Sequence, residues 1–264
     1  MLRTVARVFI EEGIGGIYVR LREKVAMKLR PSLVTSRYGV KLKGNWEDQT
    51  FLFYVQGAYG YYLSDLLHSA QDAFVFIDVG ANQGLYSILA SKNKMCERVH
   101  AFEPIHDTAA YLKENLKLNG CGNVSVWEVA LTDKSGSFQM ESNPAHTGIA
   151  SLRDGAKQSD SASLKTIRGI SRVELNDLEA PEGCRIFVKI DVEGFEETVL
   201  NELIACSFCS RIDDIFYEVD ENWVDPHRLV ALLRSRGFNE FVKVGGGAHY
   251  DVHARRGRET QPAR

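Results

Sequence analysis

Short apolar runs alternate with stretches of helical periodicity from residue 74 to about residue 253. Residues 74–79 are apolar at nearly every position, which is typical of a strand in the middle of a parallel sheet. The pattern predicts strands at 74–79, 98–102, 124–131, 185–191, 214–219, 238–244 and 249–253, and helices at 84–92, 107–118, 193–206 and 226–235. Repeated strand–helix units imply right-handed crossovers. We therefore expect an α/β fold with a doubly wound, mostly parallel sheet.

Three segments depart from this pattern. Residues 132–170 are polar and weakly periodic, with room for a hairpin, and are too long for a plain connection, which is typical of a functional loop or lid. Residues 1–30 hold seven Arg or Lys against three Glu, a net charge of +4, with apolar residues at roughly helical spacing. We predict a basic amphipathic helical extension over 1–33, one domain over 34–253, and a disordered tail over 254–264.

The basic N-terminal segment has two interpretations. A basic amphipathic segment can lie on an anionic membrane or dock a partner. More commonly such a segment packs on its own domain and keeps its charges in water.

Composition limits the classes of partner. The net charge of -3 gives no overall attraction for nucleic acid, so we expect no nucleic-acid partner. No segment is apolar for long enough to cross a bilayer, and the first residues do not read as a signal peptide. The five cysteines are an odd number at scattered positions, which favours reduced thiols and a cytoplasmic location.

The first strand runs into a turn with only two of the three glycines of the dinucleotide-binding fingerprint. Such a turn suits a ligand that lacks phosphates but carries a positive amine. Gly80 would let the backbone approach the ligand, and Asn82 is the non-glycine type best able to adopt positive φ. We predict that Asp78, Gly80, Asn82 and Gly84 bind this ligand; the alternative is an ordinary strand–helix turn.

Acidic and apolar residues at the next two strand ends extend this prediction. Glu103 stands about twenty residues past the glycine turn, where an acid accepts hydrogen bonds from both hydroxyls of a ribose. Together with the first turn, it indicates an adenosine-type ligand. We assign Glu128 and Ala130 to the edge that would flank the adenine, although a simple strand end explains them nearly as well.

Two ionisable residues interrupt the fourth strand, which should be apolar on both faces. Lys189 and Asp191 share one face by period two, so they can form an ion pair. A buried charge without a partner is destabilising by several kcal/mol, which makes this placement informative. We predict that Asp191 points into the ligand crevice; the alternative is an ion pair that only orders the strand end.

The motifs at these strand ends resemble those of the FkbM-type methyltransferases. They are FIDVGANQG at 76–84, AFEP at 101–104, VALTDKSG at 129–136 and VKIDVEGFE at 188–196. The resemblance covers roughly residues 74–220. It implies a seven-stranded, Rossmann-like methyltransferase fold, S-adenosylmethionine as methyl donor, and methylation of a hydroxyl on a glycan or small-molecule natural product.

Transfer of a methyl group to an alcohol calls for a base. We predict Asp191 as this base, with Lys189 holding its orientation; Glu193 or the loop residue His146 are alternatives. In a metal-assisted variant, Asp191 with Asp220 or Glu221 would supply oxygen ligands for Mg²⁺.

Two rivals come from other functional classes. The missing middle glycine argues against a nicotinamide-dependent oxidoreductase. The second rival, a non-catalytic binding module on the same fold, is disfavoured because Asp78, Glu103 and Asp191 are all present.

Overall fold

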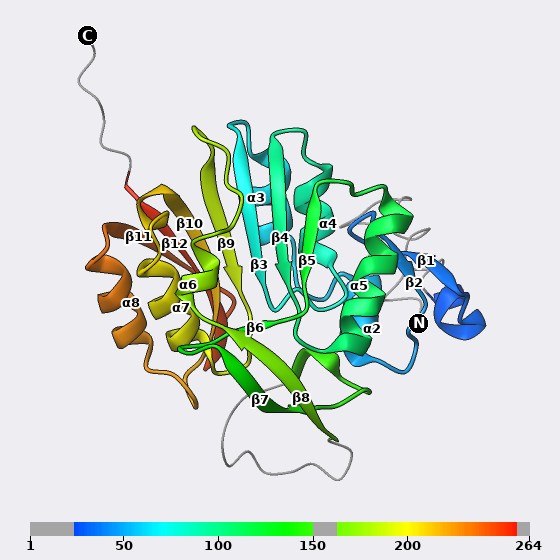
Figure 1. Ribbon diagram of the computed structural model, residues 1–264. Helices are drawn as coiled ribbons and strands as arrows, with labels where there is room; N and C mark the ends of the chain where they lie inside the picture. Colours follow the sequence, from blue (N-terminus) through cyan, green and yellow to red (C-terminus); the bar gives the residue numbers. More distant parts are fainter. Residues whose placement is uncertain (1–23, 150–162, 258–264) are drawn as a thin grey trace.

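The computed structural model describes residues 24–149 and 163–257, and its centre is a seven-stranded sheet of order β11-β12-β10-β9-β3-β4-β5 (Figure 1). The strands are β3 (Phe74–Val79), β4 (Cys96–Phe102), β5 (Val124–Trp127), β9 (Arg185–Ile190), β10 (Ile212–Asp220), β11 (Phe238–Val244) and β12 (His249–Arg256). β12 runs antiparallel to both its neighbours, and the other adjacent pairs are parallel. This confirms the predicted α/β class and the expected seven-stranded, mostly parallel sheet.

Helices cover both faces of the central sheet (Figure 1). On one face lie α6 (Arg172–Leu175), α7 (Glu196–Ile204) and α8 (Pro226–Arg234), and on the other α3 (Tyr62–Ser69), α4 (Leu85–Lys92) and α5 (His106–Asn119). Successive side chains of β3 alternate between these faces. Val75 and Ile77 therefore enter the core beneath α7, while Phe74 and Phe76 enter the core beneath α3 and α4.

The N-terminal described residues form a small unit beside α5. β1 (Leu33–Thr35) and β2 (Lys41–Lys43) pair antiparallel, and α2 (Gln49–Gln56) follows, capped by Asp48. Residues 24–29 are helical. The rest of the predicted helical extension, residues 1–23, lies outside the described part of the chain.

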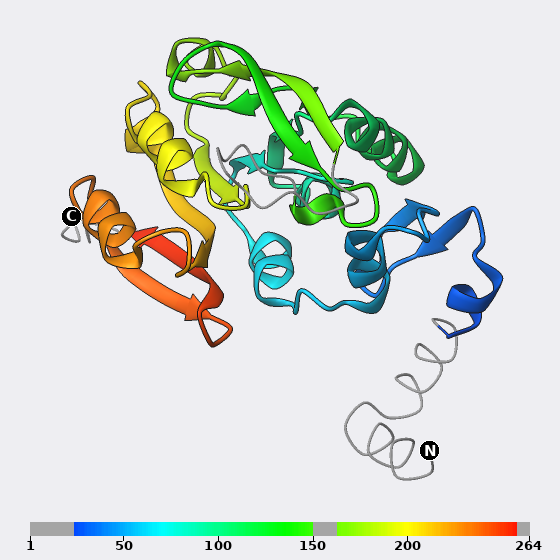
Figure 2. The same ribbon diagram turned by 90° about the horizontal axis from the view of Figure 1, so that it is seen from below.

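A second, three-stranded sheet lies below the carboxyl ends of the central strands (Figures 1 and 2). It consists of β6 (Ala130–Leu131), β7 (Gly136–Ser142) and β8 (Ser163–Ile170). The 3₁₀ turn η1 (Thr147–Ile149) follows β7 in the chain. The hairpin for which residues 132–170 had room is thus present; residues 150–162 lie outside the described ranges.

One predicted strand proved to be two. The continuous strand expected over 124–131 is wrong, because β5 ends at Trp127 and β6 pairs with β8 instead of β4. Trp127 closes the central ladder by accepting a hydrogen bond from the Glu103 N–H, and Thr132 is bonded to Ile170 in the small sheet. Apolar periodicity continues across both strands and does not reveal the change of sheet.

Two predicted boundaries also shift. The helix expected from residue 193 begins at Glu196, since Glu193 and Gly194 have φ values of 52° and 93°, outside the helical region. β12 continues to Arg256, into the segment predicted as a tail, because Ala254 and Arg255 pair with β10. A second 3₁₀ turn, η2 (Cys209–Arg211), precedes β10. In the described ranges, every helix is too short or too polar to cross a membrane.

Candidate active site

A cavity of about 430 Å³ lies at the carboxyl ends of β3, β4 and β9, between the central sheet and the small sheet. In Figure 2, which looks toward these strand ends, the small sheet (green) stands on one side and α2 and α3 (blue to cyan) on the other. Parallel strands bring their carboxyl ends to one edge of a sheet, so the turns after them meet here.

The turn after β3 closes tightly against the end of β9. Gly80 has φ 77°, and a Cβ there would lie 1.9 Å from the Asp191 carbonyl oxygen. Lys189 Nζ donates to the Gly80 carbonyl at 2.7 Å. Asn82 adopts φ 49°, as its residue type allowed us to predict, and its side chain accepts a hydrogen bond from the Thr147 hydroxyl at 3.0 Å. Gly80, Asn82 and Thr147 all line the cavity.

Glu103 is a buried carboxylate in the cavity wall. Its side chain accepts from the Asn82 N–H at 3.0 Å and from the Ile105 N–H at 2.9 Å. Burial raises the pKa of Glu103 to about 7, against the lowering effect of these two hydrogen bonds. Both oxygens are held in place beside the cavity, where they can accept hydrogen bonds from a pair of hydroxyls.

The wall next to Glu103 is apolar. The lining side chains come from the end of β4, from the link between β5 and β6, and from the small sheet: Phe102, Val129, Ala130, Leu131 and Met140. These side chains fit a flat, uncharged ring such as adenine.

Glu128, which the sequence also assigned to this edge, is not among the lining residues. Its carboxylate contacts Lys113 and His106, and these hydrogen bonds lower the pKa of Glu128. These two contacts hold the side chain away from the cavity.

Asp78 and Gly84 also stand outside the cavity lining. Asp78 is fully buried on the α4 face of β3, where it accepts from the Ser87 hydroxyl at 2.6 Å. A Cβ on Gly84 would lie 2.4 Å from Leu112 Cδ1, so this glycine permits close packing of α4 on α5. In the structure these two residues shape the turn after β3, and their predicted role in ligand binding stays a prediction.

The predicted pair of Lys189 and Asp191 is present, and Asp78 is its third member. Lys189 Nζ lies 3.3 Å from Asp191 Oδ2 and 3.4 Å from Asp78 Oδ1. Burial alone would lower the pKa of Lys189, but the charges of Asp191 and Asp78 outweigh it and raise the pKa. The ammonium thus links the buried strand to Asp191, which lines the cavity with its side chain 35% exposed.

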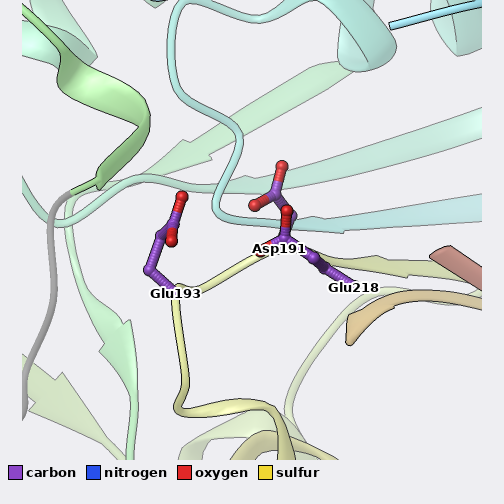
Figure 3. Close-up of side chains that lie close together, drawn as sticks. All are labelled: Asp191, Glu193 and Glu218. Atoms are coloured by element: carbon purple, nitrogen blue, oxygen red, sulfur yellow. The ribbon is translucent and has the colours of Figure 1, made fainter. Parts of the chain in front are cut away.

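Three carboxylates gather at this end of the cavity: Asp191, Glu193 and Glu218 (Figure 3). One oxygen of each lies within 4.8 Å of the others, close enough to hold one divalent cation. Glu218 Oε1 also lies 2.6 Å from His249 Nε2. Burial, with the nearby charge of Asp191, raises the pKa of Glu218 to about 8.

Glu218 corrects the predicted metal-ligand set. The sequence placed Asp220 or Glu221 beside Asp191, but the β10 carboxylate in the cluster is Glu218. Glu218 lies two residues before Asp220 and so on the same face of the strand. Asp220 lines the cavity, whereas Glu221 is not among its lining residues. Residues 214–219 hold two acids, Asp214 and Glu218, and the sequence alone does not tell which of them faces the cavity.

Aromatic residues before β3 form a wall that the sequence left unassigned. Phe53, Tyr54 and Tyr59, on and after α2, line the cavity. The predicted alternative base His146 also lines it and packs edge-on against Phe53, with ring centroids 6.0 Å apart. The only sequence signal for this wall was the density of aromatic residues between 51 and 62.

The methyltransferase FkbM domain matches residues 78–240, more than half of the chain. The chain belongs to the FkbM methyltransferase family. This confirms the resemblance carried by the strand-end motifs, and it makes the protein an S-adenosylmethionine-dependent methyltransferase. It also excludes the nicotinamide-dependent oxidoreductase.

Individual proteins and solved structures similar to this FkbM chain share low sequence identity with it. Methyltransferase 1 of Beauveria bassiana (strain ARSEF 2860) is 24% identical over 189 residues, covering 66% of this chain and 75% of that protein. Precorrin-6y C5,15-methyltransferase from Geobacter metallireducens GS-15 has a TM-score of 0.43 and 17% identity, over 74% of this chain and 86% of that one. M. jannaschii TYW2 in complex with AdoMet has a TM-score of 0.45 and 15% identity, over 86% of this chain and 88% of that one.

The cavity fits the methyl donor of the family. Glu103 has two oxygens that can accept hydrogen bonds from a pair of hydroxyls, and the apolar wall can accommodate a flat ring.

Proposed function

We propose that the enzyme transfers the methyl group to a hydroxyl oxygen of a glycan or small-molecule natural product. The observation that carries this proposal is the carboxylate cluster of Asp191, Glu193 and Glu218, whose three members line the same cavity as Glu103. A carboxylate is able to take the proton that an alcohol loses during methylation. Aromatic and acidic lining on the same side, including Tyr59, offers stacking and hydrogen bonds to a polyhydroxylated acceptor.

The residues of the chain have separate tasks in this proposal. S-adenosylmethionine supplies a methyl group on a sulfonium, whose sulfur keeps the electron pair of the broken S–C bond. Asp191 accepts the proton of the acceptor hydroxyl as the new O–C bond forms. Lys189 holds Asp191 in place at 3.3 Å, and Glu103 fixes the ribose so that donor and acceptor are aligned.

The position of the transferred methyl group tests the reaction class. The enzyme is incubated with S-adenosylmethionine labelled with ¹³C in its methyl group and a panel of methyl glycosides and hydroxylated natural products. We expect the label in a methoxy group, with a long-range NMR correlation to the carbinol carbon across oxygen. A label found on nitrogen or carbon would contradict O-methylation.

A second candidate is the metal-assisted variant, which the 4.8 Å grouping of the three carboxylates favours. Mg²⁺ held by Asp191, Glu193 and Glu218 would orient the acceptor oxygen and ease loss of its proton. In this case EDTA abolishes turnover and added Mg²⁺ restores it. Activity that resists exhaustive EDTA treatment eliminates the variant.

The remaining expectations concern location and partners. The described cysteines are all free thiols, which supports a cytoplasmic site of action. The net charge of -3 supports an acceptor other than nucleic acid.

A further inference from the structure

Residues 24–33 carry apolar side chains that the rest of the described chain leaves uncovered. Val25, Leu29 and Leu33 are 47%, 71% and 47% exposed, whereas Ala26 is 8% exposed and faces the domain. Val25 and Leu29 stand four residues apart in the helix at 24–29, so they share one side of it. Exposed apolar side chains gathered at one tip mark a surface for association.

Positive charge accompanies these apolar side chains. Lys24 and Lys28 are exposed on the same short helix. The first 30 residues carry +4 of a chain whose total is -3, so the remaining residues together carry -7 (-3 minus +4). The N-terminal stretch is thus basic, as is the C-terminal stretch 254–264, which holds four Arg against one Glu.

The tip stands clear of the catalytic part of the molecule. Figure 2 shows the helix at 24–29 (dark blue) at the edge of the fold, beyond the β1–β2 pair. Met27 Sδ accepts a weak hydrogen bond from the Gln56 amide of α2, and the buried Ala26 lies on the same short helix, so this helix packs against the domain.

We propose that the tip formed by residues 24–33 binds the surface of an anionic lipid bilayer. Val25, Leu29 and Leu33 would enter the boundary between head groups and acyl chains, and Lys24 and Lys28 would lie against the lipid phosphates. Long lysine side chains extend their ammonium groups toward such a surface while their stems remain among apolar groups. The lysines beside the exposed apolar side chains favour this occupant, because an anionic bilayer offers negative head groups and apolar acyl chains at the same surface.

Vesicle flotation of the full chain tests the proposal. The wild type is expected to float with phosphatidylcholine vesicles that contain phosphatidylglycerol and to stay unbound with phosphatidylcholine alone. The double variant Val25→Asp/Leu29→Asp should bind at least tenfold more weakly. Its matched control is Leu164→Asp/Val173→Asp, because those two side chains are 59% and 70% exposed on other elements.

A second pair of variants tests the charge. Lys24→Gln/Lys28→Gln should weaken binding about fivefold for each lysine, while Lys94→Gln/Lys134→Gln, exposed elsewhere, should leave it unchanged. A wild type that stays unbound with anionic vesicles, or tip variants that float like the wild type, would overturn the proposal. So would a dimer that dissociates in Val25→Asp/Leu29→Asp while vesicle binding persists, since the tip would then be an interface between copies.

Discussion

Replacement of Glu103 by alanine is expected to weaken S-adenosylmethionine binding. The variant removes the acceptor for two ribose hydroxyls, and a hydrogen bond to a charged group contributes about 1.5–3 kcal/mol. Water takes over part of this, so we expect a loss of affinity of at least about tenfold, or about 1.4 kcal/mol. The substitution also leaves the N–H groups of Asn82 and Ile105 without their acceptor. The free energy of unfolding of the variant should therefore be lower by about 1–3 kcal/mol for each group that water fails to reach.

Titration calorimetry with S-adenosylmethionine measures the affinity, and urea unfolding confirms that the variant is folded. Glu128→Ala is the matched control, because its carboxylate faces Lys113 and His106 outside the cavity lining and its loss should change the affinity less than twofold. An unchanged affinity in a folded Glu103→Ala variant would refute the ribose assignment.

The raised pKa of Glu103 adds a pH dependence to the same experiment. Its pKa of about 7 means that the carboxyl is protonated in a growing share of molecules as the pH falls through 7. Only the ionised form accepts from both hydroxyls, so wild-type affinity should fall below pH 7 and binding near pH 7 should release protons. The Glu103→Ala variant should lose this dependence.

Three further outcomes follow from the described geometry. Gly80→Ala should abolish tight S-adenosylmethionine binding in calorimetry, because its Cβ would lie 1.9 Å from the Asp191 carbonyl oxygen. The control Gly39→Ala is also at positive φ, but no atom lies within 4 Å of its Cβ, so it should retain binding. In the native state the pKa values of Glu103 and Glu218 are about 7 and 8, above the ordinary 4.5, so the native state holds protons that the unfolded chain has released. The free energy of unfolding measured in urea should therefore fall from about pH 5 to pH 8, and a rise would contradict these shifts. Hydrogen exchange over residues 132–170 should slow when S-adenosylhomocysteine and acceptor bind, and equal exchange in both states would remove the lid assignment.

The central strands could be predicted from sequence because both faces of the sheet are covered. Every residue of β3 is buried, so the strand is a continuous apolar run that polar surface positions do not interrupt. The residues that break this rule, Asp78 and Lys189, form an ion pair beneath the cavity. Lys189 also pairs with Asp191, which lines the cavity. Their unusual placement made them detectable.

The direction of individual side chains could not be predicted in the same way. Asp78 and Glu128 follow the pattern of ligand-binding acids, yet contacts from Ser87, Lys113 and other distant residues direct them elsewhere. The change from β5 to β6 depends on pairing with β8, which is more than thirty residues away in the chain. Glu218 enters the site only through the register of β10 against β9, which a single sequence does not contain.

The rate of methyl transfer by Asp191→Asn tests the central claim most directly. The variant keeps the size of the side chain but loses the proton acceptor, and Lys189 retains Asp78 as an ionic partner. At saturating S-adenosylmethionine, and with an acceptor found in the labelled screen, single-turnover transfer should fall by about 10²–10⁴ relative to wild type. Calorimetric affinity for S-adenosylmethionine and thermal stability should stay close to the wild-type values. A folded variant with wild-type transfer would contradict the assignment of Asp191 as the base, and an unfolded one would mean that the ion pair with Lys189 is structural.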